Sequence, residues 1–341
     1  MANYPEAEQI ASIIESAKTI VVVQADNPDS DSLASSLALE QILGDMGKDT
    51  TLYCGVDLPS YLMYLSGADR VVSELPSNFD ASIIVDTGSD ALLEQLNKTN
   101  TKSWLASRPA IVIDHHSTQP TISFATVTCN HRAVATGEII YELSQQLNWP
   151  LNEAAREFIA ISILGDSLGL TTEDTTARTI HIMAELVDSG VSLAKIENAR
   201  RETMRREPEL IHYKGDLLKR VEFHADNKIA MLSIPWEEIE KYSPLYNPPM
   251  LAIDDMRLTK NTDVAIVFKL YKDGKITAKI RSNYGKGIAG KLAEHFGGGG
   301  HAYAAGFKIT DGRQYEDIKN ETIRVAQDLL NNPGDGKDEA V

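Results

Sequence analysis

The chain has 341 residues, of which 43% are hydrophobic and 24% are charged, and its 33 basic and 49 acidic side chains give a formal net charge of −16. This length and composition are typical of a globular protein with two domains. The acidic balance argues against sequence-independent binding to long duplex nucleic acid. An anionic substrate can still be bound if metal cations cover some of the carboxylates.

The N-terminal segment and the cysteines indicate a cytoplasmic protein. Met1–Ser16 is polar and has the pattern of an amphipathic helix, without the basic start and apolar run of a signal peptide. No stretch approaches the roughly 18 consecutive apolar residues of a membrane span, so we expect no membrane partner. The two cysteines, Cys54 and Cys129, are far apart, which argues against a disulfide framework and against a thiolate zinc site.

The first half alternates short β-branched runs with helical patterns. Strands are expected at Thr19–Val23, Ser82–Val85 and Ala110–Ile113. Helices are expected at Leu33–Met46, Ala135–Leu147, Glu153–Leu164 and Thr176–Ser189. The alternation predicts an α/β domain with an open, mainly parallel sheet that has helices on both faces.

The second half has a different pattern. A charged helical stretch, Val191–Arg206, ends before Pro208, and we interpret it as a connector. Strands are expected at Val221–Phe223, Lys228–Ile234, Val264–Tyr271 and Lys275–Arg281, with a turn at Asp273–Gly274 and a final helix at Tyr315–Leu330. These elements predict a smaller α/β domain with a mixed sheet. The expected limits are a first domain at 1–190, a helical linker at 191–212, a second domain at 213–331 and a disordered tail at 332–341.

Four sites at the ends of apolar runs carry Asp or His. They are Asp29 with Asp31, Asp86, the run Asp114-His115-His116, and Asp166. The carboxyl ends of parallel strands open into one crevice, so we expect the first three sites to meet there. Carboxylates and imidazoles without thiolates favour Mn²⁺ or Mg²⁺, and two such ions can clamp a phosphate and activate a water. Asp86 would bridge the ions, because it is the lone acid on a central strand.

Each acidic site also has a purely structural interpretation. Asp29 and Asp31 flank a proline turn before a helix, and Asp86 and Asp166 could each be a cap. The Asp-His-His run directly after a buried strand has no packing explanation. Its occurrence together with the other sites favours a metal centre.

The ordered set of motifs resembles the DHH family of phosphoesterases. The parts in the first half are Asn27-Pro28-Asp29-Ser30-Asp31, Asp86-Thr87, Asp114-His115-His116 and Gly165-Asp166. In the second half, Arg281-Ser282 and the segment 297–307, which reads GGGGHAYAAGF, resemble the DHH-associated substrate domain. The resemblance covers about residues 15–330, and the motifs occur in the family's order.

The resemblance implies site residues in both halves. It implies two ions, Mn²⁺ or Mg²⁺, held by Asp29, Asp31, Asp86, His115 and Asp166. It implies catalytic roles for Asp114, His115 and His116, with His116 in contact with phosphate. Substrate contacts in the second half would come from Arg281, Ser282, Gly298, Gly299, Gly300 and His301. Glycines let backbone N–H groups approach a phosphate, and an arginine can bind it bidentately, so the residue types agree with this role.

Two interpretations of the glycine run remain. Four glycines can form a flexible loop. The Ala-Tyr-Ala-Ala-Gly-Phe that follows favours tight packing instead.

A two-domain chain of this length most resembles the nanoRNase and pAp phosphatase branch of the family, which also includes RecJ-type exonucleases and cyclic di-AMP phosphodiesterases. We therefore expect a metal-dependent hydrolase of short oligoribonucleotides, or of nucleoside phosphates such as pAp or cyclic dinucleotides. A polyphosphate or pyrophosphate phosphatase and a nucleotide-binding protein without hydrolysis are the alternatives. The sequence leaves the nucleotide, the physiological metal and the oligomeric state open, with a homodimer as one candidate.

The first motif departs from the family pattern at Ala25, where members normally carry a metal-binding histidine. A methyl group cannot bind a cation, so one ion would lose its imidazole ligand. Gln24 or Asp26 could substitute if the strand bulges, although alternation places both on the opposite face from Ala25. The segment after Asp166 also departs, because it reads Ser-Leu-Gly-Leu in place of Gly-Gly-Phe-Arg.

Overall fold

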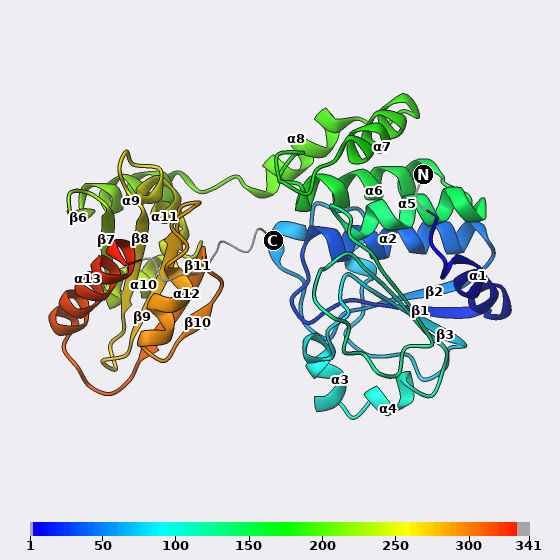
Figure 1. The fold of residues 1–341 in the computed structure, drawn as a ribbon, viewed down its shortest axis with the longest axis horizontal. Helices are drawn as coiled ribbons and strands as arrows, with labels where there is room; N and C mark the ends of the chain where they lie inside the picture. Colours follow the sequence, from blue (N-terminus) through cyan, green and yellow to red (C-terminus); the bar gives the residue numbers. More distant parts are fainter. Residues whose placement is uncertain (1–2, 333–341) are drawn as a thin grey trace. The chain divides into compact units, whose positions relative to one another are not determined.

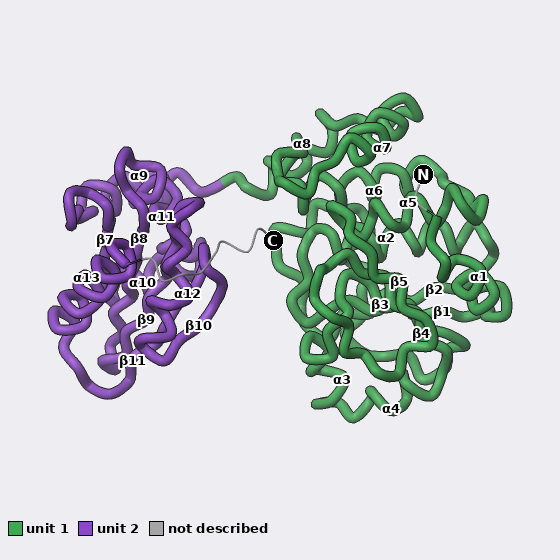
Figure 2. The backbone as a smooth tube through the Cα atoms, in the orientation of Figure 1, with its two compact units in different colours: residues 1–205 green, residues 206–341 purple. Residues whose placement is uncertain are grey.

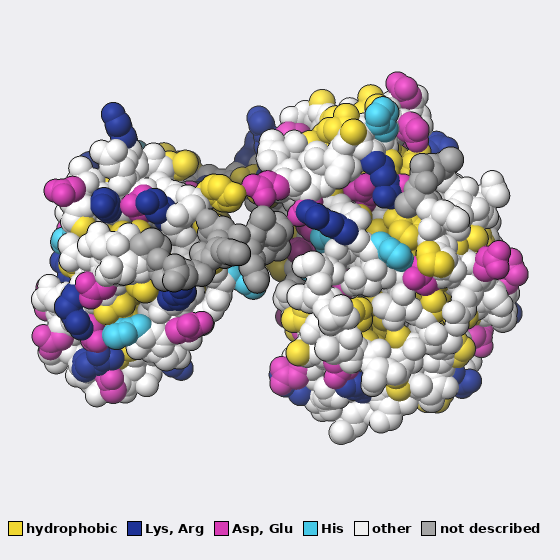
Figure 3. Space-filling view, in the orientation of Figure 1, with side chains coloured by type: hydrophobic (Ala, Val, Ile, Leu, Met, Phe, Trp, Pro, Cys, Tyr) yellow, Lys and Arg dark blue, Asp and Glu magenta, His cyan; other side chains and the backbone are white. Residues whose placement is uncertain are grey.

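The computed structural model describes residues 3–332, which belong to two compact units (Figures 1 and 2). Unit 1 is Met1–Arg205 and unit 2 is Arg206–Val341. Each unit has its own sheet and its own apolar cores. On the face shown in Figure 3, acidic and basic side chains are interspersed over both units.

The stretch expected as a helical linker, 191–212, is divided between the two units. Helix α8 (Leu193–Thr203) buries Ile196 in the core of unit 1. Helix α9 (Pro208–Lys219) buries Leu210 and Leu217 in a core of unit 2. The expected disordered tail, 332–341, lies outside the described residues except for Asn332.

Unit 1 is built on a five-stranded parallel sheet. Its strand order is β2-β1-β3-β4-β5. The strands are β1 (Thr19–Val23), β2 (Asp49–Tyr53), β3 (Ala81–Val85), β4 (Ala110–Asp114) and β5 (Val127–Asn130). The three central strands are almost wholly buried and rich in β-branched residues, as expected for strands covered on both faces. Because β1, β3 and β4 are parallel neighbours, their carboxyl ends lie side by side.

Helices cover both faces of this sheet (Figure 1). The helices on and above one face are α1 (Ala7–Ser16), α2 (Ser30–Asp45), α5 (Thr136–Leu147), α6 (Glu153–Asp166) and α7 (Ala177–Asp188). The other face packs against short helices, namely η3 (Asp90–Leu93), α3 (Glu94–Lys98) and α4 (Lys102–Leu105). Two single turns, η1 (Ser60–Leu62) and η2 (Ala68–Arg70), connect β2 to β3.

Unit 2 is built on a six-stranded mixed sheet of order β10-β11-β9-β8-β7-β6. The strands are β6 (Glu222–His224), β7 (Ile229–Ile234), β8 (Val264–Leu270), β9 (Ile276–Ser282), β10 (Gly299–Gly300) and β11 (Ala304–Ile309). Helices α12 (Ala289–His295) and α13 (Tyr315–Asn331) cover one face. Helices α9, α10 (Trp236–Tyr242) and α11 (Pro249–Arg257) form the core on the other face with β7 and β8. Strands β9 and β11 contribute no residue to this second core.

The expected fold class is confirmed in both units, because the first sheet is parallel and the second is mixed. The prediction missed β2, β5, β10 and β11. Strands β2 and β5 are the edges of the first sheet and read DTTLY and VTCN, so they lack the continuous apolar run of a central strand. Within residues 3–332, no helix is long and apolar enough to cross a membrane.

We expect Phe268→Ala to destabilise unit 2 by about 3–5 kcal/mol, because Phe268 is completely buried and packs edge-on against Phe307 and Tyr315. The matched change Phe79→Ala removes an equally buried ring from unit 1, where Phe79 packs against Trp104. Calorimetry should show each variant shifting a different unfolding transition. A common shift of all transitions by either variant would contradict independent cores.

Candidate metal centre and nucleotide pocket

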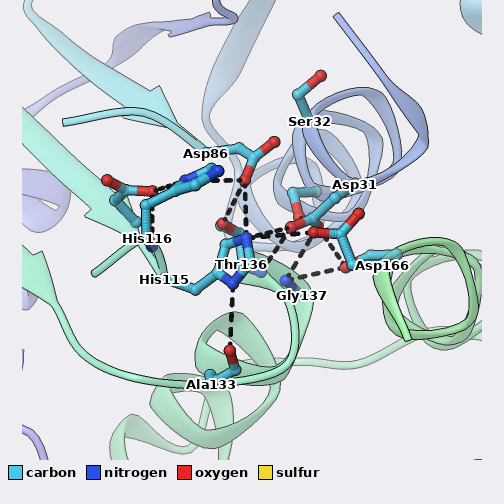
Figure 4. A network of polar contacts seen from close by, with 12 residues as sticks. Asp31, Ser32, Asp86, His115, His116, Ala133, Thr136, Gly137 and Asp166 are labelled. Atoms are coloured by element: carbon cyan, nitrogen blue, oxygen red, sulfur yellow. Dashed lines mark hydrogen bonds and ion pairs between the residues drawn. The ribbon is translucent and has the colours of Figure 1, made fainter. Parts of the chain in front are cut away.

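The acidic motifs of unit 1 converge beyond the carboxyl ends of β3 and β4 (Figure 4). Asp86 follows β3, and His115 and His116 follow β4. Asp31 lies in the first turn of α2, and Asp166 is the last residue of α6. A carboxylate at a helix C-terminus opposes the helix dipole, so capping does not explain Asp166. No helix begins at Asp86 either, and its φ of 59° is a conformation that few non-glycine residues adopt.

His115 is the centre of the cluster. Its Nε2 lies 3.2 Å from Asp166 Oδ2, 3.4 Å from Asp86 Oδ1 and 3.6 Å from Asp31 Oδ2. Its Nδ1 lies 3.1 Å from the carbonyl oxygen of Ala133, which can only accept a hydrogen bond. Neutral His115 therefore carries its proton on Nδ1 and directs the Nε2 lone pair at three carboxylates, and this buried Nε2 has no hydrogen-bond partner. That arrangement is typical of a metal-binding imidazole.

The electrostatics of the cluster favour positive charge at its centre. Burial lowers the pKa of His115, but the carboxylates of Asp166, Asp86 and Asp31 outweigh it and raise the pKa to about 12. Burial, reinforced by the charge of Asp31, raises the pKa of Asp86 well above its usual range. Without another cation, protons are thus held where several negative charges meet. A divalent cation bound to oxygen and imidazole ligands would neutralise the same charges.

At this centre, two groups of side chains have ligand atoms close enough to share an ion. One is Asp31, His115 and Asp166, and the other is Asp86, His115 and His116. Within each group the ligand atoms lie within 4.8 Å of one another. The donor set contains no thiolate and fits Mn²⁺ or Mg²⁺ better than structural zinc.

Asp31 is held in place by the start of α5 and by hydroxyl groups. Its side chain is completely buried and accepts hydrogen bonds from Thr136 N at 2.7 Å, Ser162 Oγ at 2.5 Å and Ser35 Oγ at 2.9 Å. The hydroxyl of Thr136 also donates to Asp86 Oδ1 at 3.1 Å. Such outer partners orient carboxylate ligands and keep them ionised.

Asp114 belongs to neither ligand group and contacts His116. The completely buried Asp114 carboxylate lies 2.7 Å from His116 Nδ1, and Asn130 Nδ2 donates to its other oxygen at 3.1 Å. Burial raises the pKa of Asp114, but the hydrogen bond from His116 and the charges of both histidines outweigh it and hold the pKa below its usual range. The hydrogen bond to Asp114 raises the pKa of His116. His116 is half-exposed and can therefore meet a substrate.

Asp29 belongs to neither ligand group. It is the N-cap of α2, where its Oδ1 accepts a hydrogen bond from Ser32 N at 3.0 Å and Ser32 Oγ accepts one from Asp29 N. The capping interpretation therefore describes its contacts in this structure. Asp29 as an ion ligand stays a prediction of the sequence analysis.

The two neighbours of Ala25, Gln24 and Asp26, are polar, but only Asp26 has a hydrogen-bond partner for its side chain. Asp26 accepts a hydrogen bond from Gln95 N at 2.8 Å, so its carboxylate is already engaged. Gln24 is completely buried, and both its amide nitrogen and its amide oxygen lack a hydrogen-bond partner. Alternation along β1 places Gln24 on the same face as Val22, which packs against the core of α2 and α5. Buried amides in native proteins nearly always have a hydrogen-bond partner, so the unpartnered amide of Gln24 at the carboxyl end of β1 is unusual.

Unit 2 contains a pocket of about 740 Å³ over the face of β9 and β11 that the second core leaves uncovered. Arg281 and the glycines 297–300 line it. A Cβ on Gly298 would lie 2.3 Å from the carbonyl oxygen of Gly306, and one on Gly300 would lie 2.5 Å from Ala305 Cα. These glycines therefore allow close packing against β11, which the sequence analysis favoured over a flexible loop.

Two other residues expected to contact the substrate do not line this pocket. Ser282 is 1% exposed and follows Ile280 on the face that packs against α12 and α13. His301 is exposed, and its N–H donates to the carbonyl oxygen of Ala304 at 2.8 Å. The sequence analysis also missed Lys269, Lys279 and Lys308, which do line the pocket. Nothing in a single sequence distinguishes these lysines from ordinary surface lysines.

Comparisons with known proteins cover both units. The family model for the DHH family, N-terminal domain, matches residues 19–165, and the model for the DHHA1 domain matches residues 246–328. The chain is 25% identical over 297 residues to the bifunctional oligoribonuclease and PAP phosphatase NrnA of Bacillus subtilis, with 85% of this chain and 89% of that protein covered. It is 24% identical over 302 residues to the protein of the same name from Thermus thermophilus, with 87% and 86% covered. The crystal structure of an exopolyphosphatase-related protein from Bacteroides fragilis has the same fold, with a TM-score of 0.80 at 20% identity over 96% of this chain and 97% of that one.

We expect His115→Ala to weaken Mn²⁺ binding, because the change removes the imidazole nitrogen that three carboxylates surround. The loss should exceed the roughly 10- to 100-fold that is typical of losing a residue that only orients a ligand. Mn²⁺ should raise the unfolding temperature of the wild-type protein, and titration of this shift measures the affinity. Asp26→Asn is the matched control, since an asparagine can still accept the hydrogen bond from Gln95 N. Equal loss of affinity in both variants would contradict this ligand set.

We expect Gln24→Met to stabilise the metal-free protein and to weaken Mn²⁺ binding. Removing a buried amide without partners relieves a desolvation penalty on the order of 1–3 kcal/mol. The affinity for Mn²⁺ should fall because methionine cannot replace an amide that contacts the ion or its bound water. Ser82→Ala is the matched control, because Ser82 Oγ is also buried and unpartnered but lies near the start of β3. Unchanged Mn²⁺ affinity in Gln24→Met would show that Gln24 has no role at the centre.

Proposed function

The chain belongs to the DHH family of phosphoesterases, and on this basis we propose that it is a metal-dependent hydrolase of short oligoribonucleotides or of nucleoside phosphates such as pAp and cyclic dinucleotides. The observation that carries the proposal is the buried Nε2 of His115, which faces three carboxylates and lacks a hydrogen bond. Similarity to two proteins named as oligoribonuclease and PAP phosphatase supports the substrate class.

Two ions, Mn²⁺ or Mg²⁺, would be held among Asp31, Asp86, His115 and Asp166, with the one free nitrogen of His115 serving one of them. Asp86 has an oxygen 3.4 Å from His115 Nε2. Ions of this kind polarise a phosphoryl oxygen and lower the pKa of water. The carboxylates around His115 would fix where such ions lie.

His116 is suited to contact the phosphoryl group. Its Nδ1 is bound to Asp114, so the ring orientation is set and Nε2 is left for a substrate. Because the Asp114 hydrogen bond raises the pKa of His116, the protonated ring is favoured and can donate to a phosphoryl oxygen that gains charge in the transition state. Asp114 is thus a positioning residue.

Unit 2 would bind the nucleotide through its pocket. Arg281 Nη1 donates to the carbonyl oxygen of Ile280 at 3.0 Å, which leaves further N–H groups for an anion. The backbone along 297–300 borders the same pocket. Glycines there admit a ligand close to the main chain.

A nucleotide-binding protein without hydrolysis is the second candidate, and Ala25 favours it. Ala25 is 4% exposed and presents a methyl group where the family pattern has a ligand. Asp31, Asp86, His115 and Asp166 nevertheless present ligand atoms to one another, which favours the enzyme.

We expect the protein with Mn²⁺ to hydrolyse at least one of pApA, pAp and cyclic di-AMP in preference to inorganic tripolyphosphate. His116→Ala should lower kcat by roughly 100- to 1000-fold, the usual effect of removing one donor to a developing oxyanion. His181→Ala is the matched control, because His181 is an exposed histidine on α7 that bonds the carbonyl of Ala177. Nucleotide binding without turnover at millimolar Mn²⁺ would establish the non-catalytic alternative. Preference for tripolyphosphate would establish a polyphosphatase.

A further inference from the structure

Unit 1 contains a further group of potential metal ligands apart from those around His115. It consists of Glu6, Cys129 and His131, whose ligand atoms all lie within 4.8 Å of one another. Glu6 directly precedes α1, Cys129 lies in β5, and His131 directly follows that strand. Side chains two residues apart on a strand leave the same face, so Cys129 and His131 both face the start of α1.

This group lies on the other side of β5 from the residues that support the His115 centre. Asn130, between Cys129 and His131, faces the opposite way. Its Nδ2 donates to Asp114 Oδ2 and to the carbonyl oxygen of His116, both at 3.1 Å. His131 Nε2 instead lies 3.0 Å from an oxygen of the Glu6 carboxylate. The two groups of ligands are therefore separate.

The Cys129 thiol is the unusual member of the group. It is completely buried, and among residues 3–332 it has no hydrogen-bond partner. Cys54 is also buried, but its Sγ donates to the carbonyl oxygen of Ala25 at 3.5 Å. A cysteine can fill a core as a small apolar residue. That interpretation does not explain why Cys129 Sγ lies beside an imidazole and a carboxylate.

The surroundings of the group carry negative charge. The ring of Tyr4 lies 4.9 Å from that of His131, and Arg178 donates to the Tyr4 hydroxyl at 3.1 Å. Arg178 is paired with two buried glutamates, Glu138 and Glu142, which more than balance its charge. The carboxylate of the group itself adds a further negative charge. A cation is therefore favoured over an anion at this position.

The ligand types select a thiophilic ion and not Mn²⁺ or Mg²⁺. Burial, reinforced by the charge of Glu6, raises the pKa of the Cys129 thiol to about 12, so the thiol keeps its proton unless a metal replaces it. Zn²⁺ binds thiolate, imidazole and carboxylate ligands, whereas Mn²⁺ and Mg²⁺ prefer oxygen. The ligand atoms of a tetrahedral zinc ion lie roughly 3.3–3.6 Å apart, so small side-chain movements suffice here.

We propose that Glu6, Cys129 and His131 form a second metal site, which binds Zn²⁺ with water as the fourth ligand. The side chains of Glu6 and His131 are partly exposed, so the ion can enter from solvent. Binding releases the thiol proton, and the bound ion ties the start of α1 to the end of β5. The distance between the two cysteines argued against a zinc site with several thiolates, but this site needs only one. It does not depend on the hydrolase activity, because no residue around His115 takes part.

The test is a Co²⁺ titration of the metal-free, full-length protein, followed by absorbance in the near ultraviolet. Co²⁺ accepts the same nitrogen, oxygen and sulfur ligands as Zn²⁺. A thiolate ligand gives Co²⁺ a charge-transfer band that oxygen and imidazole ligands do not give. The ligand groups around His115 contain no thiolate, so Co²⁺ bound there does not produce this band. In the wild-type protein the band should reach saturation and disappear when Zn²⁺ is added. Its absence would overturn the proposal.

Matched variants identify the ligands. Cys129→Ala should abolish the band, and Cys54→Ala, which removes the other buried thiol, should keep it. Glu6→Gln and His131→Gln should each weaken Co²⁺ binding by roughly 100-fold or more, since losing a residue that only orients a ligand already costs roughly 10- to 100-fold. His181→Gln, at an exposed histidine on α7, should leave the affinity unchanged.

Circular dichroism of the metal-free variants checks that they fold. Glu6→Gln tests the site even where Cys129→Ala does not fold, because Glu6 is partly exposed and the change keeps its size. A band that persists in Cys129→Ala, or that is lost equally in Cys54→Ala, would contradict Cys129 as the thiolate ligand and overturn the site. Unchanged Co²⁺ affinity in both Glu6→Gln and His131→Gln would overturn it as well.

Discussion

The approach of three carboxylates to one imidazole nitrogen is the constraint on which unit 1 depends. Asp31, Asp86 and Asp166 lie within 3.2 to 3.6 Å of His115 Nε2. Burial of Asp31 and Asp86 makes the repulsion between these carboxylates stronger than it would be in water. Such a cluster persists only if a cation or protons balance it. The surrounding residues hold the cluster in place. The first N–H of α5 and several hydroxyl groups donate hydrogen bonds to Asp31, and the carbonyl oxygen of Ala133 fixes the tautomer of His115.

The strain at this edge of the sheet is consistent with a site that is held in place by its surroundings. Asp86 adopts a left-handed backbone conformation, and Asp166 lies at the unfavourable end of a helix dipole. Neither the backbone conformation of Asp86 nor the position of Asp166 stabilises the fold by itself. Both direct a carboxylate at His115, which explains why residues that disfavour local structure occur where three elements meet.

Unit 2 gathers basic side chains where unit 1 gathers carboxylates. Helices cover β7 and β8 on one face of its sheet, and the neighbouring strands remain open to form a pocket bordered by lysines, an arginine and closely packed glycines. An acidic protein thus carries a local cationic site. Its net charge of −16 describes its behaviour toward long polyanions and not toward a small anion.

The sequence by itself determined the central elements and the order of the motifs. Runs such as Ile20–Val23 and Ile111–Ile113 are apolar enough to be read as buried strands, and the short polar segments after them were expected to meet because parallel strands share one carboxyl edge. Edge strands such as β2 were missed because their residues are largely polar. Only the tertiary structure decided which acids converge, since Asp29 caps a helix while Asp31, two residues later, points at His115. It also decided that Gln24 is buried without a partner and that Lys269 and Lys279 share a pocket, because side-chain burial and cross-strand neighbours depend on contacts far apart in the chain.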